Sequence, residues 1–407
     1  MHIVFLTDNF PPEGNAPANR TFEHAREWVR QGAKVTVITC APNFPEGSVF
    51  EGYKNSWYDR SELEGIEVRR VKTYITANEG FVKRILDYMS FMVMGFLAGL
   101  MVRKVDVVIA TSPQFFCACA GWLLSVFKRK PFIFELRDIW PASITAVGAM
   151  EKSFIIRLLE KLELFLYRRA DKIISVTHAF KQELIERGIN HDKIEVVLNG
   201  VDLSAYKVQE KDAELLSEYN LTGKFVAAYV GTHGLAHALE TLVEAAEQLQ
   251  SRDDIVFLFA GGGAQSNMVA NLVREKALNN VRVLGRMDKQ LMPRIWSVCD
   301  VSLVHLRNAD LFRTVIPSKI FEAMGMGLPM IIGVPEGEST GIVRDAGAGI
   351  VVEPENAAAI AQAIVTLADS EKEYVRLSEG AVGAATKYDR KTLAVEMLGM
   401  IEHCVAQ

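Results

Sequence analysis

Hydrophobic residues along this chain gather in short runs, and most of these runs end at a glycine or a polar cluster. The first run, residues 2–7, is followed by a polar loop, a helix-like segment to about residue 31, a glycine and a second run at 34–39. Short apolar runs bounded in this way are typical of buried strands, and the order strand–helix–strand indicates a parallel sheet. Further strand-like runs continue the series, at residues 65–71, 106–110, 131–134, 172–176 and 193–198.

A second series begins after a polar, irregular stretch at residues 203–222, with runs at 225–230, 255–260, 281–284, 301–306, 330–333 and 349–352. Two such series predict an α/β chain with two doubly wound, Rossmann-like domains. We expect an N-terminal domain at 1–200, a C-terminal domain at 201–385, and a helix at 386–407 that can return to the first domain. Ligands should then bind in a cleft where the two domains face each other with the carboxyl ends of their strands.

An apolar segment without charge covers residues 88–102, and basic residues lie on both sides of it. Because a bilayer span needs about 20 apolar residues, this segment is too short to cross a membrane comfortably. Two interpretations stay open: a buried core helix, or a helix in the membrane interface whose basic flanks meet anionic lipid. Residues 152–169 repeat the pattern with five basic residues and favour peripheral membrane contact: Lys152, Arg157, Lys161, Arg168 and Arg169.

Composition sets limits on the class of protein. At 407 residues the chain is long for a single core, and 49% hydrophobic with 23% charged residues is typical of a folded protein. With 45 basic and 50 acidic residues the net charge is −5, which gives no support for a nucleic-acid partner. The five cysteines lie mostly in apolar runs, so we expect buried thiols in a reducing cytoplasm. The first strand follows Met1 directly and leaves no room for a signal peptide.

Residues 313–330 carry the strongest candidate chemistry. Pro317 is a favoured helix-entry residue, Ser318 and Lys319 follow it, and Glu322 lies on the first turn. Two glycines and a proline then end the helix before the strand at 330–333. A helix N-terminus attracts anions, and the hydroxyl, ammonium and carboxylate can hold a phosphate and a nearby diol. The alternative is an ordinary capped helix with a solvated lysine and glutamate.

A second candidate cluster follows the strand at 131–134. Arg137, Asp138 and Trp140 are costly to bury unpaired at the end of a central strand, so a ligand-facing position is favoured. Asp138 could then serve a reacting hydroxyl, Arg137 could meet a phosphate, and Trp140 could pack on a sugar face. A structural pair of Arg137 with Asp138 remains the alternative.

Two glycine-containing loops follow the first strands of the two domains. The loop around Gly14 is not a dinucleotide fingerprint, yet it lies where such sheets bind ligands; a proline-rich connector is the alternative. The second loop, residues 231–234, places His233 and, further on, His237 where they could face a phosphate or simply be packed. Neither histidine has the spacing of a metal site.

Taken together, these features resemble the retaining glycosyltransferases of family 4, which have the GT-B fold. The resemblance rests on the two wound halves, the Gly14 loop, the N-G-V-D segment at 199–202, the strand end at Gly285 and the F-E-A-M-G-M-G-L-P segment at 321–329. The P-S-K and R-D-I-W-P segments are similar to bacterial O-antigen and capsule transferases, including L-fucosamine transferases.

The resemblance implies that a sugar moves, with retention, from a nucleotide sugar to a lipid-linked acceptor in bacterial surface polysaccharide synthesis. A UDP-linked donor, with an N-acetylated amino sugar as one option, and a polyprenyl-diphosphate-linked sugar acceptor are the expected substrates. The expected location is the cytoplasm, with peripheral contact at the inner face of the cytoplasmic membrane. The resemblance also implies no cofactor, no metal and no nucleic-acid partner.

The resemblance further assigns roles to residues of this sequence. Glu322 would bind the ribose and Ser318 the donor, while Gly285 and Arg286 would lie near the base. The loop with Gly231, His233 and Gly234 would border the diphosphate. Gly14, Asn15 and Asn19 would approach the donor phosphates or the acceptor from the first domain, and Arg137 and Trp140 would lie on the acceptor side.

The sequence departs from the family pattern at the first acid. The family has a glutamate, seven residues and a second glutamate, whereas Thr314 stands eight positions before Glu322. The family's arginine and lysine of the second domain correspond to Thr232 and His237. Catalysis therefore falls to Asp138, Lys319 and Arg313, with Lys319 neutralising charge on the departing diphosphate.

Two other functions share parts of this description. A non-hydrolysing sugar-nucleotide epimerase would have the same fold and donor class but would not need basic apolar helices in the first domain. A non-catalytic partner that binds membrane or nucleotide sugar would not need Asp138, Lys319 and Glu322 together.

Overall fold

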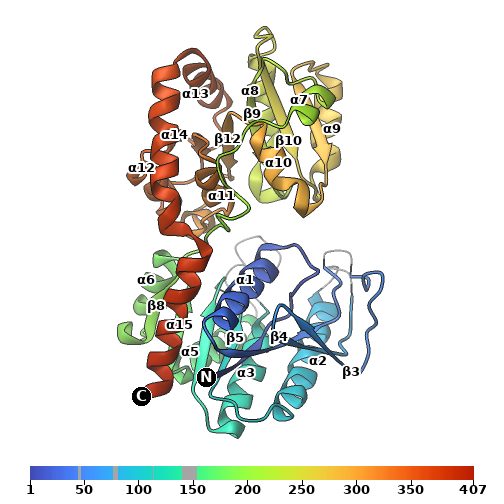
Figure 1. Ribbon diagram of the computed structural model, residues 1–407, viewed down its shortest axis with the longest axis vertical. Coiled ribbons are helices and arrows are strands. Elements are labelled where there is room, and N and C mark those ends of the chain that lie inside the picture. The colour runs from blue at the N-terminus through green and yellow to red at the C-terminus, as the bar shows by residue number, and fades with distance from the viewer. Residues whose placement is uncertain (45–46, 77–80, 113, 140–153) are drawn as a thin grey trace. The chain divides into compact units, whose positions relative to one another are not determined.

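The computed structural model describes residues 1–44, 47–76, 81–112, 114–139 and 154–407, and its chain forms two compact units (Figure 1). Unit 1 consists of Met1–Leu198 and Arg390–Gln407, and unit 2 consists of Asn199–Asp389. Each unit contains its own sheet with helices packed on it, and among the described residues all strand pairs but one are parallel. The predicted α/β class with two doubly wound sheets is confirmed.

Unit 1 is built on an eight-stranded sheet in which β1 lies between β2 and β5. The chain therefore builds the sheet outward in one direction from β1 and then in the other, which makes the β1–β5 boundary the topological switch point. In sheet order the strands are β3 (Tyr58–Leu63), β4 (Ile66–Val71), β2 (Lys34–Cys40), β1 (His2–Leu6), β5 (Val107–Thr111), β6 (Phe132–Leu136), β7 (Lys172–Ser175) and β8 (Ile194–Val196).

Helices cover both faces of this sheet because alternate strand residues point to opposite sides. On β1, Val4 and Leu6 join one apolar cluster, whereas Ile3 and Phe5 join another on the opposite face. The first cluster includes residues of α2, α3, α5 and α6, and the second includes residues of α1 and α15. The helices of unit 1 are α1 (Ala16–Arg30), α2 (Phe81–Leu100), α3 (Phe115–Lys128), α5 (Phe154–Arg169), α6 (His178–Glu186) and α15 (Arg390–Ala406), with a 3-10 turn η1 (His191–Lys193).

Helix α15 packs in unit 1 although it ends the chain. The buried Trp28 of α1 donates its indole N–H to the Ala394 carbonyl at 2.8 Å, and Arg390 pairs with Glu23. Met397 is fully buried in the cluster that also holds Ile3 and Phe5. The last helix therefore completes the core of the unit that the first strand begins.

Unit 2 is built on a six-stranded, all-parallel sheet with its switch point between β9 and β12. In sheet order the strands are β11 (Val281–Gly285), β10 (Ile255–Ala260), β9 (Phe225–Val230), β12 (Val301–His305), β13 (Met330–Gly333) and β14 (Gly349–Val351). The helices are α7 (Ala213–Glu218), α8 (Leu239–Gln248), α9 (Ser266–Glu275), α10 (Met292–Ser297), α11 (Lys319–Met326), α12 (Glu338–Asp345), α13 (Ala357–Asp369) and α14 (Glu371–Ala385). Short 3-10 turns are η2 (Leu235–His237), η3 (Lys289–Leu291), η4 (Asp310–Thr314) and η5 (Thr386–Tyr388).

Strand β3 has no counterpart in the sequence prediction. It pairs antiparallel with β4 at the edge of the sheet, and almost all of its residues are exposed. A strand that buries neither face lacks the apolar pattern by which strands are recognised, so the sequence gives no signal for it.

The two apolar segments with basic residues, at 88–102 and 152–169, differ in how far their apolar side chains are buried. On α5, Leu159, Leu166 and Tyr167 are buried in the core of unit 1, so most of its apolar stripe packs against protein. Helix α2 buries Phe91 and Ala98 but leaves other apolar side chains in solvent, so it is both a core helix and a helix with an exposed apolar face. Within the described ranges, no helix is long and apolar enough to cross a membrane.

Candidate functional site

In unit 2, three strands end at a glycine or directly before one, and these glycines let the backbones approach closely. Gly231 and Gly261 have φ values of 134° and 146°, a region that side chains rarely adopt. A Cβ on Gly261 would lie 1.8 Å from the Gly231 carbonyl oxygen. The Gly261 N–H donates to the Gly285 carbonyl at 2.7 Å. The predicted loops at Gly231 and Gly285 therefore lie together at the carboxyl edge of the sheet.

Helix α11 starts and stops where the sequence predicts. Ser318 is the N-cap residue, Lys319 is the first helical residue, and Gly327 ends the helix with a left-handed backbone at φ 69°. The Ser318 side chain makes no capping hydrogen bond, so its hydroxyl remains available to a ligand. The anion-attracting end of α11 is thus lined by the residues that the sequence singles out.

The Lys319 ammonium is held close to this edge by packing. Its Nζ lies 3.3 Å from the ring centroid of the buried Tyr229, and a Cβ on Gly231 would lie 3.4 Å from the same nitrogen. Within the described structure Nζ has no hydrogen-bond partner, although Lys319 is only 7% exposed. Burial lowers the pKa of Lys319 to about 7, against the opposing charge of Glu322. A buried, unsatisfied ammonium of this kind favours an anion beside it.

The histidines at this edge are uncharged at neutral pH. Burial, reinforced by the Lys319 charge, lowers the pKa of His233 and His237 to about 4. His233 is fully buried, and its Nδ1 lies 3.3 Å from the Ser266 hydroxyl. His237 and His305 each contact the backbone carbonyl of the other. The Nε2 of His233 is also buried and has no hydrogen-bond partner among the described residues, and the cation beside Gly231 is Lys319.

Glu322 and Arg286 lie further along the same edge. The Glu322 carboxylate is half-buried and accepts a hydrogen bond at 3.1 Å from the indole N–H of the buried Trp296. Arg286 is exposed directly after Gly285, and a Cβ on Gly262 would lie 3.2 Å from the Arg286 Cβ. Their roles toward ribose and base remain predictions.

Arg313 does not join this group by any contact that the structure describes. It lies on η4, its side chain is 61% exposed, and its Nε is 3.1 Å from the exposed Asp310 carboxylate. An exposed pair of this kind holds neither partner firmly. The position of the guanidinium therefore gives no support to its predicted catalytic role, which stays a prediction.

Unit 1 has a pocket of about 260 Å³ at its own switch point, and we call it the acidic pocket. Asp8 and Asn9 line it from the end of β1, and Thr111 and Ser112 from the end of β5. Ligands bind at such positions in doubly wound sheets. Two predicted site residues, Asn15 and Arg137, also line this pocket.

Acidic side chains line the acidic pocket. The Asp8 residue keeps some exposure, but its carboxyl is enclosed, and burial raises its pKa to about 8, with Asp87 and Glu13 adding to the rise. Glu13 holds the loop in place by accepting backbone N–H groups of Asn43 and Phe44 at 2.9 Å. At neutral pH the Asp8 carboxyl is therefore mostly protonated and can both donate and accept a hydrogen bond.

Arg137 pairs with Glu135 rather than with Asp138. Its Nη2 lies 2.6 Å from Glu135 and 2.8 Å from the Thr21 hydroxyl, and its Nη1 donates to the Pro17 carbonyl at 2.9 Å. With the Nε bond to Glu135, four of the five N–H groups of Arg137 are bonded. The alternative of a structural pair between Arg137 and Asp138 is thus replaced by a pair with Glu135, and one N–H group of Arg137 remains for a ligand.

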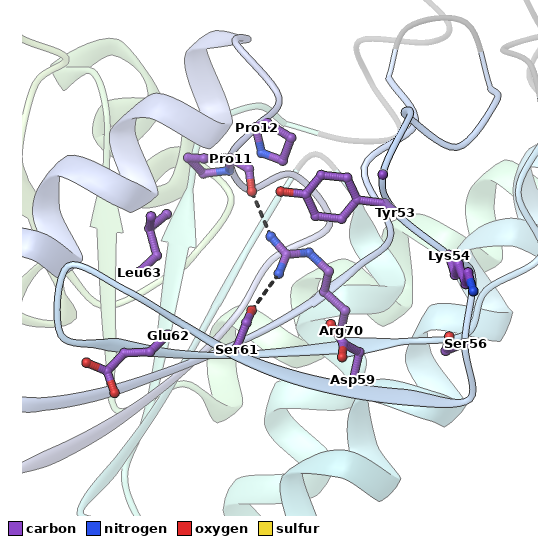
Figure 2. A pocket seen from close by; sticks show the side chains of 11 residues that line it. Pro11, Pro12, Tyr53, Lys54, Ser56, Asp59, Ser61, Glu62, Leu63 and Arg70 are labelled. Carbon is purple, nitrogen blue, oxygen red and sulfur yellow. Dashed lines mark hydrogen bonds between the residues drawn. The ribbon is translucent and has the colours of Figure 1, made fainter.

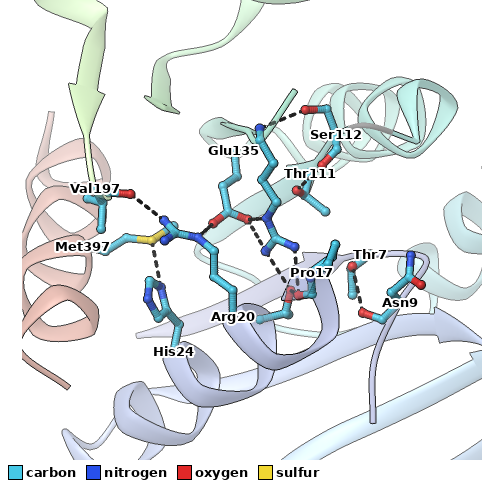
Figure 3. Close-up of polar contacts among 12 residues, drawn as sticks. Thr7, Asn9, Pro17, Arg20, His24, Thr111, Ser112, Glu135, Val197 and Met397 are labelled. Atoms are coloured by element: carbon cyan, nitrogen blue, oxygen red, sulfur yellow. Dashed lines mark hydrogen bonds and ion pairs between the residues drawn. The ribbon is translucent and has the colours of Figure 1, made fainter. Parts of the chain in front are cut away.

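Arg20 completes this buried cluster (Figure 3). Its Nε lies 2.8 Å from Glu135, and its two terminal nitrogens donate to the carbonyls of Val197 and Leu198. Burial alone would raise the pKa of Glu135, but the charges of Arg137 and Arg20 lower it. The cluster ties α1 to β6 and to the chain after β8, which fixes the wall of the acidic pocket.

Three of the remaining predicted residues, Gly14, Asn15 and Asn19, lie in the first turns of α1 or directly before it. Asn15 caps the helix by accepting the Ala18 N–H at 2.9 Å and donates to Asn9 at 2.6 Å. Asn19 donates to the carbonyl of the exposed Gly14. Asp138 is half-buried after β6, and its carbonyl accepts the Ser112 hydroxyl at 3.0 Å. Trp140 lies outside the described residues.

Several residues of these sites escape sequence reasoning. Tyr229 looks like an ordinary strand residue, because only packing places its ring under Lys319. Asp8 carries a weak signal, since it is an acid directly after the first buried strand. All five cysteines are buried and free, as expected. Across the described ranges no group of three or more His, Cys, Asp or Glu side chains could hold a metal ion, and metal independence stays a prediction.

Comparisons with known proteins cover nearly the whole chain. Residues 18–205 match the family described as Glycosyltransferase Family 4, and residues 211–382 match the family described as Glycosyl transferases group 1. A relative from Escherichia coli (strain K12), described as a colanic acid biosynthesis glycosyl transferase (WcaI), is 23% identical over 89% of this chain and 91% of its own length.

Solved structures share the architecture. Alr3699/HepE from Anabaena, in complex with UDP, is 17% identical and has a TM-score of 0.72 over 99% of this chain and 100% of its own. A sucrose-phosphate synthase from Thermosynechococcus elongatus is 17% identical and has a TM-score of 0.79 over 100% of this chain and 99% of its own. At these identities the likeness shows the fold, and the GT-B architecture expected from the sequence is confirmed.

Proposed function

The chain belongs to the glycosyltransferases, with a family 4 N-terminal part and a group 1 C-terminal part, and we propose that it transfers sugar from a UDP-sugar to a polyprenyl-diphosphate-linked acceptor. The product would serve bacterial surface polysaccharide synthesis. The name of the Escherichia coli relative, which refers to colanic acid, supports the pathway class, and the UDP complex of the Anabaena structure supports the nucleotide. N-acetylated amino sugars are the first donors to test.

The observation that carries this proposal is the Lys319 ammonium beside Gly231. A cation that is 7% exposed, without a hydrogen-bond partner among the described residues, and located at a helix N-terminus is suited to a diphosphate. The Gly231 loop admits the phosphates closely because glycine has no side chain. Ser318 and His233 would add hydrogen bonds, and Glu322 would bind the ribose hydroxyls with Gly285 and Arg286 near the base.

The proposed reaction is a same-face displacement. The bond between the sugar C1 and the diphosphate oxygen breaks while the acceptor oxygen bonds to C1, and the acceptor proton passes to the departing diphosphate. Lys319 stabilises the charge that grows on this leaving group, which is a term of several kcal/mol in enzymes. No nucleophilic carboxylate is required, so the threonine at position 314 is compatible with retention.

The acidic pocket of unit 1 would hold the acceptor. Asn15 and the remaining N–H group of Arg137 offer donors there, while the Asp8 carboxyl can donate or accept. Asn19, close by on α1, would approach the acceptor from outside this pocket. Asp138 and Trp140 follow β6 in the sequence. Asp138 would act toward the acceptor hydroxyl, and Trp140 toward the sugar face. No metal or other cofactor has a role in this proposal.

A membrane-facing surface would bring the enzyme to a lipid-linked acceptor. Leu86, Val93 and Leu97 on α2 are 49%, 52% and 47% exposed, and they repeat at helical spacing along one side. Phe127 at the end of α3 is 67% exposed and packs edge-on against Phe96. We call these residues, with Met89, Leu100, Met101 and Val126, the α2 surface.

Exposed basic residues border the α2 surface where α2 and α3 end: Arg103, Lys104, Arg129 and Lys130. Apolar side chains beside cations are the combination that binds the interface of an anionic bilayer. We therefore propose peripheral contact with the inner face of the cytoplasmic membrane.

A release assay tests the proposed reaction. Purified protein is mixed with UDP-N-acetylglucosamine, UDP-N-acetylgalactosamine and other UDP-sugars, with and without a polyprenyl-diphosphate-linked sugar, and free UDP is measured. Acceptor-dependent UDP release supports transfer, whereas sugar isomerisation without acceptor would support an epimerase instead. NMR of the product then tests retention, and an inverted anomeric configuration would refute it.

A further inference from the structure

A second cavity of unit 1, of about 470 Å³, lies between the β3–β4 hairpin and the loop that follows β1 (Figure 2). We call it the edge pocket. Pro11 and Pro12 line it from the loop, Tyr53 from the segment before β3, and Asp59 and Glu62 from β3 itself. None of the roles given above involves it.

Arg70 forms the floor of the edge pocket and is fixed in place. It is 7% exposed, its Nη1 donates to the Ser61 hydroxyl at 3.0 Å, and its Nη2 donates to the Pro11 carbonyl at 2.8 Å. The ring of Tyr53 lies over the guanidinium, with 5.1 Å from its carbon to the ring centroid. Among the described residues the buried Nε of Arg70 has no hydrogen-bond partner. The pocket is therefore a built site with a donor left unsatisfied.

The lining of the edge pocket suits an uncharged sugar. Asp59 and Glu62 are balanced by Lys54 and Arg70, so the cavity carries no excess of either charge. Sugar hydroxyls can accept from cations and donate to carboxylates, and an aromatic ring such as Tyr53 can pack on the apolar face of a pyranose. A simple anion would meet two carboxylates here, and a simple cation would meet Arg70.

The edge pocket and the acidic pocket share one loop. Asp8 and Asn9 line the acidic pocket, and Pro11 and Pro12 line the edge pocket. Because consecutive Cα atoms are about 3.8 Å apart, the Cα atoms of Asn9 and Pro11 are at most about 7.6 Å apart. Glu13 and Arg70 hold this loop from its two sides through the bonds to Asn43 and Pro11. One ligand with more than one sugar ring could thus reach both cavities.

We propose that the edge pocket is a subsite for a second or later sugar of the acceptor, so that the glycan of the lipid-linked acceptor is an uncharged oligosaccharide rather than a single sugar. This inference rests on the proposed transferase function, because it assigns the acidic pocket to the acceptor end. The pocket would select glycan length by adding binding energy only when the acceptor reaches past the Pro11–Pro12 segment.

Glycan binding without donor tests this inference separately from catalysis. The full chain is applied to an array of monosaccharides, neutral oligosaccharides of two to six rings, and uronate-containing oligosaccharides. We expect retention of neutral oligosaccharides at least tenfold above monosaccharides and above uronate-containing glycans. The Tyr53→Ala variant should lose this preference, whereas Tyr58→Ala, which alters an exposed tyrosine of β3 that does not line the pocket, should keep it.

The outcomes separate the two proposals. Retention that Tyr53→Ala leaves unchanged, retention equal for one ring and several, or no retention of any oligosaccharide would overturn the subsite. Thermal unfolding of both variants shows whether they are folded, and if Tyr53→Ala is not, Glu62→Gln, with a side chain exposed on β3, replaces it. Absence of UDP release in the presence of acceptor would instead count against the transferase itself.

Discussion

Lys319 shows how far a single residue can be understood from sequence. The helix start that carries it is predictable, because proline, serine and glycine occupy positions with known preferences in α11. Its burial is not predictable, because it depends on Tyr229 and Gly231 from a strand about ninety positions earlier. The same limit holds for Arg137, because two of its partners, the Pro17 carbonyl and the Thr21 hydroxyl, come from the distant helix α1.

Replacing Lys319 by alanine should lower turnover more than donor affinity. If the ammonium stabilises the leaving diphosphate, kcat should fall by roughly 100- to 1,000-fold while KM for the donor changes much less. Steady-state kinetics with the UDP-sugar measures both. The control is Lys276→Ala, which removes a partly exposed lysine paired with Glu247 in the same unit. Equal losses in kcat and affinity would make Lys319 a plain binding residue.

The Asp8 carboxyl should make unit 1 less stable as pH rises. Its pKa is raised to about 8 from a usual 3.8, so between these values the folded state binds more protons than the unfolded state. The free energy of unfolding should therefore fall from about pH 4 through pH 8 by an amount on the order of several kcal/mol.

Asp8→Asn should abolish this fall, so the variant should match the native chain near pH 4 and exceed its stability near pH 8. Urea unfolding at both pH values measures the difference. Asp59→Asn, at an exposed aspartate, is the matched control. A stability difference that does not change with pH would show that the carboxyl is not enclosed as described.

At the scale of elements, apolar pattern decides what can be predicted. Most buried strands of both sheets are recognisable because they bury both faces, whereas the exposed β3 is not. The pattern of apolar residues also does not show how much of an apolar helix is covered by the rest of the protein. Helices α2 and α5 look alike in sequence, yet α5 buries most of its stripe and α2 does not.

The α2 surface predicts binding to anionic vesicles. Val93→Glu places a charge in the middle of the exposed stripe and should weaken partitioning by tenfold or more, measured by sedimentation with vesicles of phosphatidylglycerol and phosphatidylcholine. Val375→Glu changes a valine of similar exposure on α14, 43% against 52%, and should have no effect. The membrane role of α2 would be contradicted if both variants partitioned equally. It would also be contradicted if the protein bound neutral vesicles as well as anionic ones.

At the scale of the whole molecule, two cores share one chain that crosses between units twice. Unit 1 receives its last helix from residues that follow unit 2 in sequence. Six residues of α15 are buried in unit 1: Leu393, Ala394, Met397, Leu398, Ile401 and Cys404. The sequence predicts a helix here that can return to the first domain, but not the contacts with α1 that hold it, such as the bond from the Trp28 indole to the Ala394 carbonyl.

Removal of residues 390–407 should therefore unfold unit 1 and spare unit 2. Burying a Leu, Ile or Met side chain contributes about 1.5–3 kcal/mol, so the lost contacts are comparable with a typical domain stability of roughly 5–15 kcal/mol. Scanning calorimetry should show one transition lost and one kept. Removing only residues 406–407 is the control, and two intact transitions after the longer truncation would show that α15 is dispensable.

The central claim is that Lys319 meets the donor diphosphate, and calorimetry of UDP binding tests it most directly. Near pH 8 most of the Lys319 amine is neutral, since its pKa is about 7, and a bound diphosphate should raise that pKa. We predict uptake of nearly one proton per UDP bound, seen as a binding heat that changes with the ionisation enthalpy of the buffer. The uptake should vanish in Lys319→Met. A binding heat independent of the buffer, or an uptake that survives this substitution, would contradict the claim.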